Sequence, residues 1–324
     1  MTKITIAVLT FNSAQTIERC LDAIYAQSLP RTLYDVLVLD NGSSDATLHI
    51  VGRYPCSVLV CPEKTISELR NLAVATSQAP LIAFVDSDCV IPPNWLQNAL
   101  PWLDAPLVAV AGCKYKPPPN ASRFERNWYG SPSQHLKHND LIPAGNMVLR
   151  KSTFLALGGF DPTLITGEDA FFLARVRRNG YVAINDPSLS SIHLGNPKSL
   201  REFFKKEIWY GLGNLNPKTA LTLRDRPFLT AHLVLFLLLV VIISTVGGAY
   251  RIALASFLLC LGVILASAFH RRYIKQVTGS FWYMALAYVV YYFARIASLL
   301  YVYKLKRVHR SSPQRPSPKR VASS

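Results

Sequence analysis

A short apolar run that ends in two carboxylates constrains the fold of this chain more than any other stretch. The run is L-I-A-F-V at positions 81–85, and D-S-D follows at 86–88. An unbroken apolar run of this length is typical of a central strand that is buried on both faces. Asp86 and Asp88 lie on the same side of an extended chain, because side chains alternate with period two. Two adjacent like charges favour a divalent cation with oxygen ligands, although an ordinary Asx-rich turn has the same composition.

The sequence before this run alternates between strand and helix patterns. Strand-like runs occur at 4–9, 36–39 and 58–60, and helical spacing of apolar residues begins at Ile17, near Ser44 and at Ile66. Asn12 or Ser13 is placed to cap the first of these helices. This succession of strands and helices predicts an α/β fold, with a parallel sheet and helices on its faces.

Polar clusters follow three of the predicted strands, at 10–12, 40–44 and 86–88. The carboxyl ends of the strands in an open α/β sheet form the edge at which ligands bind, so three clusters on one edge predict a ligand site. Two common nucleotide-binding signatures, G-x-G-x-x-G after the first strand and G-x-x-x-x-G-K-[ST], do not occur in the sequence. A dinucleotide dehydrogenase and a P-loop NTPase therefore find no support.

The segment after the sheet pattern contains a long loop and a short helix. Residues 114–142 are irregular and include three consecutive prolines, and loops of this length are usually functional. Asp169 opens a predicted helix that ends at Asn179-Gly180. A carboxylate at a helix N-terminus is commonly a cap favoured by the helix dipole, so position alone leaves a cap and a catalytic role open. His193 follows another strand-like run, where a single histidine is ordinarily a packing or surface residue.

The C-terminal third carries long apolar runs. Positions 228–246 and 252–269 are each long enough to span a bilayer core of ~30 Å at 1.5 Å per residue. A buried core helix explains one such run, but two in tandem favour a membrane hairpin. Basic residues flank both ends, so the positive-inside rule places the hairpin ends and the N-terminal part in the cytoplasm. The formal charge of +16 suits an anionic membrane surface, and no nucleic-acid motif accompanies it.

Three further segments complete this region. Residues 198–216 have the amphipathic pattern of an interfacial segment. The run at 281–303 is rich in tyrosine, and it either spans the membrane or lies in the interface. Its polar stripe consists of Tyr288, Tyr291, Arg295 and Ser298. The basic stretch from 304 to 324 is predicted to be a disordered tail.

The cysteines and the N-terminus bear on the cellular compartment. The six cysteines form no C-x-x-C pair, which argues against a zinc site and a disulfide framework and fits a reducing compartment. No secretory signal is recognisable at the N-terminus. We therefore expect a cytosolic catalytic part.

Six short motifs in a fixed order carry a family resemblance. They are T-F-N at 10–12, L-D-N-G-S-S-D at 39–45, E-L-R-N at 68–71, D-S-D at 86–88, G-G-F-D at 158–161 and G-E-D-A-F-F at 167–172. Over about residues 4–213, this ordered set resembles the family-2 glycosyltransferases of the GT-A fold. The resemblance implies transfer of a sugar from a nucleotide donor, with inversion at the anomeric carbon.

The resemblance also implies roles for individual residues. Thr10, Asn12, Asp40, Arg70 and Asp86 are expected to bind the donor, Gly145, Asn146 and Glu168 to lie on the acceptor side, Asp88 and His193 to hold Mg²⁺ or Mn²⁺, and Asp169 to be the catalytic base. The chemistry agrees with these roles, because a divalent metal neutralises a leaving diphosphate and a carboxylate can take the proton of an acceptor hydroxyl.

The sequence departs from the family pattern at two places. Processive relatives carry a (Q/R)-x-x-R-W motif, but the nearest stretch, K-K-E-I-W at 205–209, lacks its arginine. This departure predicts transfer of a single sugar rather than polymer synthesis. Asn41 stands where many relatives have a second aspartate.

These observations predict a GT-A domain at 1–225, a membrane region at 226–303 and the basic tail. The expected protein is a glycosyltransferase anchored in the plasma (inner) membrane that glycosylates a lipid-linked acceptor on the cytoplasmic side. We expect it to act in bacterial exopolysaccharide or cell-envelope synthesis, with a glycolipid or polyprenyl-phosphate acceptor as the nearest alternative. An inactive nucleotide-sugar-binding scaffold is the alternative from another functional class. No nucleic-acid partner is expected.

Overall fold

The N-terminal part of the chain, residues up to 213, is built on one mixed β-sheet. The family resemblance predicts that it is catalytic, and we call it the catalytic part. The computed structural model describes residues 3–130, 137–138, 141–164, 166–213 and 226–311. The main sheet has the order β3-β2-β1-β4-β8-β6-β9-β7. Its strands are β1 (Ile4–Thr10), β2 (Tyr34–Asp40), β3 (Ser57–Val60), β4 (Leu81–Asp86), β6 (Val108–Gly112), β7 (Lys137–His138), β8 (Asn146–Arg150) and β9 (Val182–Asn185). A second, two-stranded sheet pairs β5 (Cys89–Val90) with β10 (Ile192–His193).

The parallel part of the sheet is as the sequence predicts. Strands β3, β2, β1 and β4 run parallel to one another. Because Leu9 pairs with Leu39 on one side and with Asp86 on the other, three polar strand ends meet at one edge. The other half differs from the expectation of a purely parallel sheet, since β8 runs antiparallel to both β4 and β6, and β7 antiparallel to β9.

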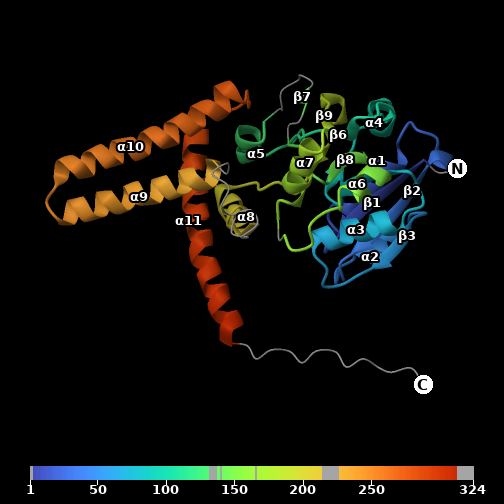
Figure 1. Ribbon diagram of the computed structural model, residues 1–324, viewed down its shortest axis with the longest axis horizontal. Coiled ribbons are helices and arrows are strands. Elements are labelled where there is room, and N and C mark those ends of the chain that lie inside the picture. The colour runs from blue at the N-terminus through green and yellow to red at the C-terminus, as the bar shows by residue number, and fades with distance from the viewer. Residues whose placement is uncertain (1–2, 131–136, 139–140, 165, 214–225, 312–324) are drawn as a thin grey trace.

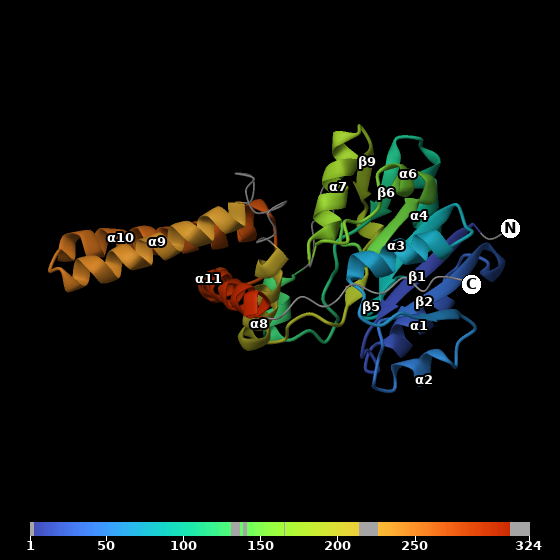
Figure 2. The ribbon, with the colours of Figure 1, turned by 60° about the horizontal axis from the view of Figure 1, so that its bottom comes forward.

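Helices cover both faces of the sheet, as Figure 2 shows. They are α1 (Ile17–Tyr25), α2 (Thr47–Val51), α3 (Ile66–Thr76), α4 (Trp95–Asp104), α5 (Arg123–Trp128), α6 (Lys151–Ala156) and α7 (Glu168–Arg178). The alternation of β1 divides the core between the faces. Ile6 and Val8 pack in a cluster with α1 and α4, whereas Ala7 and Leu9 pack in a cluster with α3, α6 and α7. Both faces of β1 are therefore covered, which explains its apolar run from Ile6 to Leu9.

Several local expectations are corrected. The first helix starts after Thr16, which makes no side-chain capping bond, and the backbone carbonyl of Ser13 accepts from Thr16 and Ile17 instead. The long irregular segment contains α5, which begins with a capping box between Ser122 and Glu125. The expected end of α7 is confirmed, because Gly180 has a positive φ of 78° and the helix stops at Arg178.

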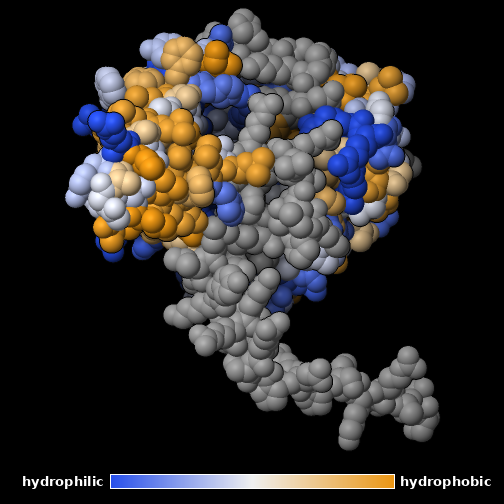
Figure 3. Space-filling model, turned by 60° about the vertical axis from the view of Figure 1, so that its left-hand side comes forward, coloured by the Kyte–Doolittle hydropathy of each residue, from blue (hydrophilic) through white to orange (hydrophobic). Residues whose placement is uncertain are grey.

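The C-terminal region forms a hairpin that projects from the catalytic part (Figure 1). It consists of α9 (Arg226–Val246) and α10 (Tyr250–Phe269), and α10 continues into one π-helical turn at His270–Ile274. Within the described residues, two stretches are long and apolar enough to cross a membrane, Leu229–Val246 and Tyr250–Ile274. Figure 3 brings this side forward and shows apolar residues gathered on it. Exposed side chains such as Ile243 and Val246 contribute to this surface.

Helix α11 (Phe281–Ser311) runs crosswise at the base of the hairpin (Figure 1). Its polar stripe faces the protein, because Arg295 donates to Glu207 at 2.7 Å and Tyr288 packs on Trp128. Its opposite face exposes Trp282, Leu286 and Phe293. This arrangement favours the interfacial alternative for the third apolar run, because the polar stripe is already used against the catalytic part.

Two predicted boundaries differ from the structure. The amphipathic segment at 198–216 forms α8 (Leu200–Gly213), but its Phe203 is fully buried against Phe124 and Trp128. The apolar face of α8 is therefore covered in part by protein, while Trp209 on the same helix stays exposed. Helix α11 continues past the predicted start of the tail at 304, and the remaining tail, 312–324, lies outside the described residues, as does the predicted domain boundary at 225.

Candidate functional site

The end of β4 is held by an ion network. Asp86 Oδ1 accepts from Arg70 Nη2 at 2.9 Å, and Asp86 Oδ2 accepts from the Tyr115 hydroxyl at 3.1 Å. Arg70 also donates to Glu168. Burial alone would lower the pKa of Arg70, but Asp86 and Glu168 raise it overall, so this guanidinium stays charged. Arg70 thus joins the sheet edge to the start of α7 and fixes the orientation of Asp86.

The small sheet brings Asp88 and His193 together from distant parts of the chain. In the β5–β10 pair, His193 stands opposite Cys89, the residue after Asp88. Leu194 N donates to the Asp88 carbonyl at 2.8 Å, which closes the pairing. His193 Nε2 lies 3.4 Å from Asp88 Oδ2. The two side chains that the family resemblance predicts as metal ligands therefore lie next to each other.

The residues at this position fit a divalent metal. Ligand atoms of Asp88, Cys89 and His193 lie within 4.8 Å of one another. Burial raises the pKa of Cys89 well above its ordinary value, and Asp86 and Asp88 raise it further. Mg²⁺ and Mn²⁺ also prefer oxygen ligands over sulfur, so Cys89 is not an expected ligand. His193 is buried, and its Nδ1 has no hydrogen-bond partner among the described residues. Asp88 and His193 are the ligands that the donor set favours for Mg²⁺ or Mn²⁺.

Two glycines leave room for the carboxylates. A Cβ at Gly195 would meet Asp88 Oδ2 at 1.9 Å, and a Cβ at Gly145 would meet Asp86 Oδ2 at 1.9 Å. These distances are far below van der Waals contact, so any side chain at either position would displace the carboxylate. Gly145 was predicted on the acceptor side, and its structural effect is to accommodate Asp86.

The residues predicted to bind the donor do not all reach the cleft. Thr10, Arg70 and Asp86 line it, and its volume is about 360 Å³. Asp40 is fully buried, and its carboxylate accepts from the backbone N–H groups of Gly42 and Ser43 at 2.9 and 2.8 Å. Asn12 accepts from Ser44 N at 2.9 Å. Asp40 and Asn12 therefore shape the loop at 41–44, which presents Asn41 to the cleft.

Of the three residues predicted on the acceptor side, Asn146 is part of the core. Its side chain is fully buried and donates to the Cys113 and Leu189 carbonyls at 2.8 and 2.9 Å. Asn146 thus joins three segments of the core, and its place on the acceptor side stays a prediction. Glu168 is paired with Arg70, so it acts on the site through the ion network.

Asp169 stands at the first turn of α7, next to the ion network. Gly167 precedes the helix with a left-handed φ of 81°, and Asp169 Oδ1 accepts from Ala170 N at 2.6 Å. Burial and the Glu168 charge raise the pKa of Asp169 to about 6, against the lowering effect of backbone N–H groups and Arg70. A carboxylate with this pKa is suited to accept a proton near neutral pH. Asp169 therefore combines the position expected of a residue that stabilises a helix start with the raised pKa expected of a catalytic base.

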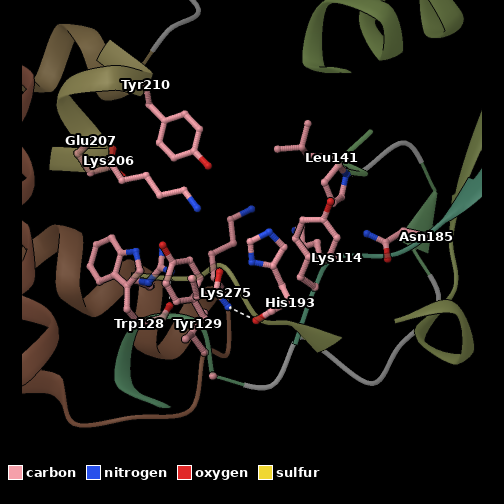
Figure 4. Close-up of a pocket in the computed structure, with 16 residues that line it drawn as sticks. Lys114, Trp128, Tyr129, Leu141, Asn185, His193, Lys206, Glu207, Tyr210 and Lys275 are labelled. Atoms are coloured by element: carbon pink, nitrogen blue, oxygen red, sulfur yellow. Dashed lines mark hydrogen bonds between the residues drawn. The ribbon is translucent and has the colours of Figure 1, made fainter. Parts of the chain in front are cut away.

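A second hollow, which the sequence analysis did not predict, adjoins the cleft. It has a volume of about 480 Å³ and shares His193, Lys206 and Tyr210 with the donor cleft. Figure 4 shows these side chains directed into the same space. Lys206 and Trp209 belong to the stretch at 205–209, which partly matches the (Q/R)-x-x-R-W motif of processive relatives. That partial match was the sequence feature that could have drawn attention to this hollow. Tyr115, by contrast, lies in the irregular loop and carries no recognisable pattern.

Comparison with protein families agrees with the geometry. Residues 5–155 match the family described as Glycosyl transferase family 2, and residues 81–297 match Glycosyl transferase family group 2. The second match covers more than half of the chain and includes the hairpin and part of α11. It therefore treats the catalytic part and the helical region as one unit.

Individual relatives are similar over different shares of their length. The glycosyltransferase AglE of Haloferax volcanii is 25% identical over 65% of this chain and 73% of its own. The O-antigen chain rhamnosyltransferase WbaN of Salmonella anatum is 26% identical over 52% and 59%. The poly(ribitol-phosphate) β-N-acetylglucosaminyltransferase TarS of Staphylococcus aureus is 33% identical, but over only 32% of this chain and 19% of its own.

One solved structure shares the fold over nearly the whole chain. It is the mannosyltransferase PcManGT of Pyrobaculum calidifontis, in complex with GDP-Man and Mn²⁺. The TM-score is 0.59 at 18% identity, and the alignment covers 96% of this chain and 88% of that one. This likeness establishes the GT-A fold.

Proposed function

The chain belongs to the family-2 glycosyltransferases, and from this premise we propose that it transfers one sugar, with inversion, from a nucleotide donor to a lipid-linked acceptor at the cytoplasmic face of a membrane. One observation carries the proposal: the cleft around Asp86 and Asp88 adjoins a cavity that the base of the apolar hairpin helps to line. An enzyme that meets its acceptor in a bilayer needs this proximity. Synthesis of a bacterial cell-envelope polysaccharide is the setting that suits such an acceptor.

The donor is proposed to lie along the sheet edge. Asp88 and His193 would hold Mg²⁺ or Mn²⁺, and the ion would neutralise the charge of the leaving diphosphate. Thr10 and Asn41 line the same cleft. The Asn41 amide is bonded to the Lys64 backbone, so the Thr10 hydroxyl, which has no hydrogen-bond partner among the described residues, is proposed to bind the nucleoside. Asp86, which Arg70 and Tyr115 hold in place, faces the cleft between these two ends.

Asp169 is proposed to be the catalytic base. The acceptor hydroxyl oxygen attacks the anomeric carbon, the bond from that carbon to the diphosphate breaks, and the hydroxyl proton passes to the Asp169 carboxylate. Nucleoside diphosphate leaves on the opposite face of the sugar, which gives inversion. The pKa near 6 makes Asp169 a stronger proton acceptor than an ordinary aspartate while leaving it mostly ionised at neutral pH.

The test is transfer of labelled sugar by the full chain. The protein is purified in detergent and incubated with Mn²⁺, extracted bacterial lipids and a panel of radiolabelled UDP-, GDP- and dTDP-sugars. We expect one donor to give label in the organic phase, and Asp88→Asn to abolish this label. Label that is found only in water-soluble products would contradict the lipid acceptor. Donor binding without turnover in any condition would favour an inactive scaffold.

A further inference from the structure

The cavity beside the donor cleft is assembled from several separate parts of the chain. Lys114 and Tyr115 follow β6, Trp128 ends α5, Lys206 and Tyr210 come from α8, and Arg271 and Lys275 come from the turn after α10. Its volume of about 480 Å³ lies in the range of small-molecule sites. That is room for a phosphorylated sugar, whereas a long lipid chain would have to lie outside, along the hairpin.

The described residues that line this cavity are strongly cationic. Four carry a positive charge, Lys114, Lys206, Arg271 and Lys275, and Glu207 carries the single negative charge. Glu207 is already paired with Arg295 of α11 at 2.7 Å. Figure 4 shows Lys206 and Lys275 extending into the open space from different elements. A concave site with this excess of positive charge attracts an anion.

Arg271 is fixed in place rather than free in solvent. Its guanidinium carbon lies 3.9 Å from the centre of the Trp128 ring, and it donates to the Trp128 carbonyl. Its Nε atom is buried and has no hydrogen-bond partner among the described residues. The neighbouring loop is also docked, because Ser280 N donates to Asn127 at 2.6 Å. The hairpin base therefore forms a stable wall of the cavity.

A simpler explanation for these cations is the positive-inside rule, by which basic residues flank membrane helices without binding a ligand. Arg272 and Lys205 fit that explanation, since neither lines the cavity and Lys205 is exposed. Arg271, Lys275 and Lys206 differ, because they converge on one hollow from α8 and from the end of α10. A flanking role does not require such convergence.

We infer that this cavity binds the phosphate group of a phosphorylated lipid acceptor, with Arg271 and Lys275 as its ligands from the hairpin base. The inference rests on the proposed function, because it names the chemical class of the proposed acceptor. The cavity lies where α10 returns to the catalytic part, at the level where a lipid phosphate would sit if α9 and α10 span the bilayer. The shared residue His193 connects it with the donor cleft.

Binding of short probes to the full chain in detergent tests this inference by calorimetry. The probes are geranyl phosphate, geraniol and inorganic phosphate. We expect geranyl phosphate to bind, geraniol not to bind, and Lys275→Gln to weaken geranyl phosphate about tenfold through loss of one charge-assisted contact. Lys275 is exposed, so this variant should fold normally. Arg271→Gln should weaken binding as well, with folding checked by its melting curve.

The control variants are Arg272→Gln and Lys205→Gln, which remove the same charge next to the cavity and should leave binding unchanged. Equal weakening by all four variants would show a general surface charge effect and overturn the inference. Inorganic phosphate that binds as tightly as geranyl phosphate would assign the site to free phosphate instead of a lipid. Loss of UDP or GDP binding in Lys275→Gln would assign the cavity to the donor, which also overturns the inference.

Failure of this inference can be told from failure of the proposed function. The probe measurements need no sugar transfer, so they remain valid if no donor is turned over. If lipid glycosylation is observed but geranyl phosphate binding is unchanged in Lys275→Gln and Arg271→Gln, only the phosphate site is wrong.

Discussion

The sheet side and the hairpin side of the site are built by different means. On the sheet side, Asp86 and Asp88 follow a single strand, and parallel pairing of β1 with β2 and β4 aligns the neighbouring polar ends. On the hairpin side, Lys206 and Arg271 come from helices that meet only through tertiary packing. The first half is therefore encoded locally, whereas the second exists only if α5, α8, α10 and α11 pack correctly.

The two halves also differ in how their charges are balanced. The carboxylates of the sheet side are held by partners within the protein, as Asp86 is by Arg70 and Tyr115. The cations of the hairpin side outnumber the carboxylates around them. This difference suggests that the sheet side is preorganised for a metal and donor, and the hairpin side for an anionic group of the acceptor.

The largest expected effect concerns Asp169. Asp169→Asn should lower kcat by about 10²–10⁴-fold with little change in donor affinity, because an amide cannot take the proton. If Asp169 were only a helix cap, the asparagine would keep most of its capping ability and activity would persist. Steady-state kinetics on the purified variant decides between them. Turnover within a few-fold of wild type would move the base role elsewhere, with Glu168 the first candidate.

The next effect concerns Gly195. Gly195→Ala should lower activity roughly 10²-fold, because its Cβ would displace the Asp88 carboxylate by an ångström or more and misplace the metal. Folding should be retained, since the atom displaced is the end of a side chain. Manganese affinity, followed by isothermal titration calorimetry, should fall in parallel. Gly262→Ala is the matched control, as a Cβ there meets open space; equal activity of the two variants would contradict the metal assignment.

A smaller effect should appear in the pH profile. The base must be ionised, and the raised pKa of Asp169 means that its ionised fraction falls below about pH 6. We expect kcat/KM to be flat above this pH and to drop about tenfold per pH unit below it. An aspartate of ordinary pKa would keep the profile flat down to about pH 4. A flat profile between pH 4 and 6 would therefore show that the base does not have the raised pKa assigned to Asp169.

The smallest effect on donor binding, which is the task proposed for the sheet side, should come from breaking the ion pair between α8 and α11. Arg295→Met leaves Glu207 buried without its partner, which costs up to about 3–5 kcal/mol of stability. We expect a lower melting temperature in detergent and weaker acceptor use, with donor affinity unchanged within about twofold. A matching loss of donor affinity would show that the two halves are not separable.

The sequence was informative where function follows directly from strand order. The sequence located the strands β1 to β4, the D-S-D turn and the start of α7. Strand and helix patterns are local, and the polar motifs at 10–12, 40–44 and 86–88 directly follow the strands. The local hydrogen bonds of Asp40 could not be foreseen, because no sequence pattern distinguishes a loop-forming aspartate from one that faces a ligand. Its carboxylate accepts from two N–H groups of its own loop, and its role in donor binding stays a prediction.

Residues that act through tertiary packing could not be predicted. Tyr115 reaches Asp86 from an irregular loop, and Arg271 reaches Trp128 across 143 positions of sequence. The antiparallel insertion of β8 between β4 and β6 was also missed, because a short apolar strand has no direction in the sequence. The core position of Asn146, which lies on that strand, was therefore not foreseen.

The central claim, that one active site binds its donor at the sheet edge and its acceptor at the hairpin base, is tested most directly by two Michaelis constants. The donor and lipid-acceptor constants would be measured for wild type, Gly195→Ala and Lys275→Gln. The account predicts that Gly195→Ala raises the donor constant and that Lys275→Gln raises only the acceptor constant, by about tenfold. A rise of the same constant in both variants would contradict the division of the site.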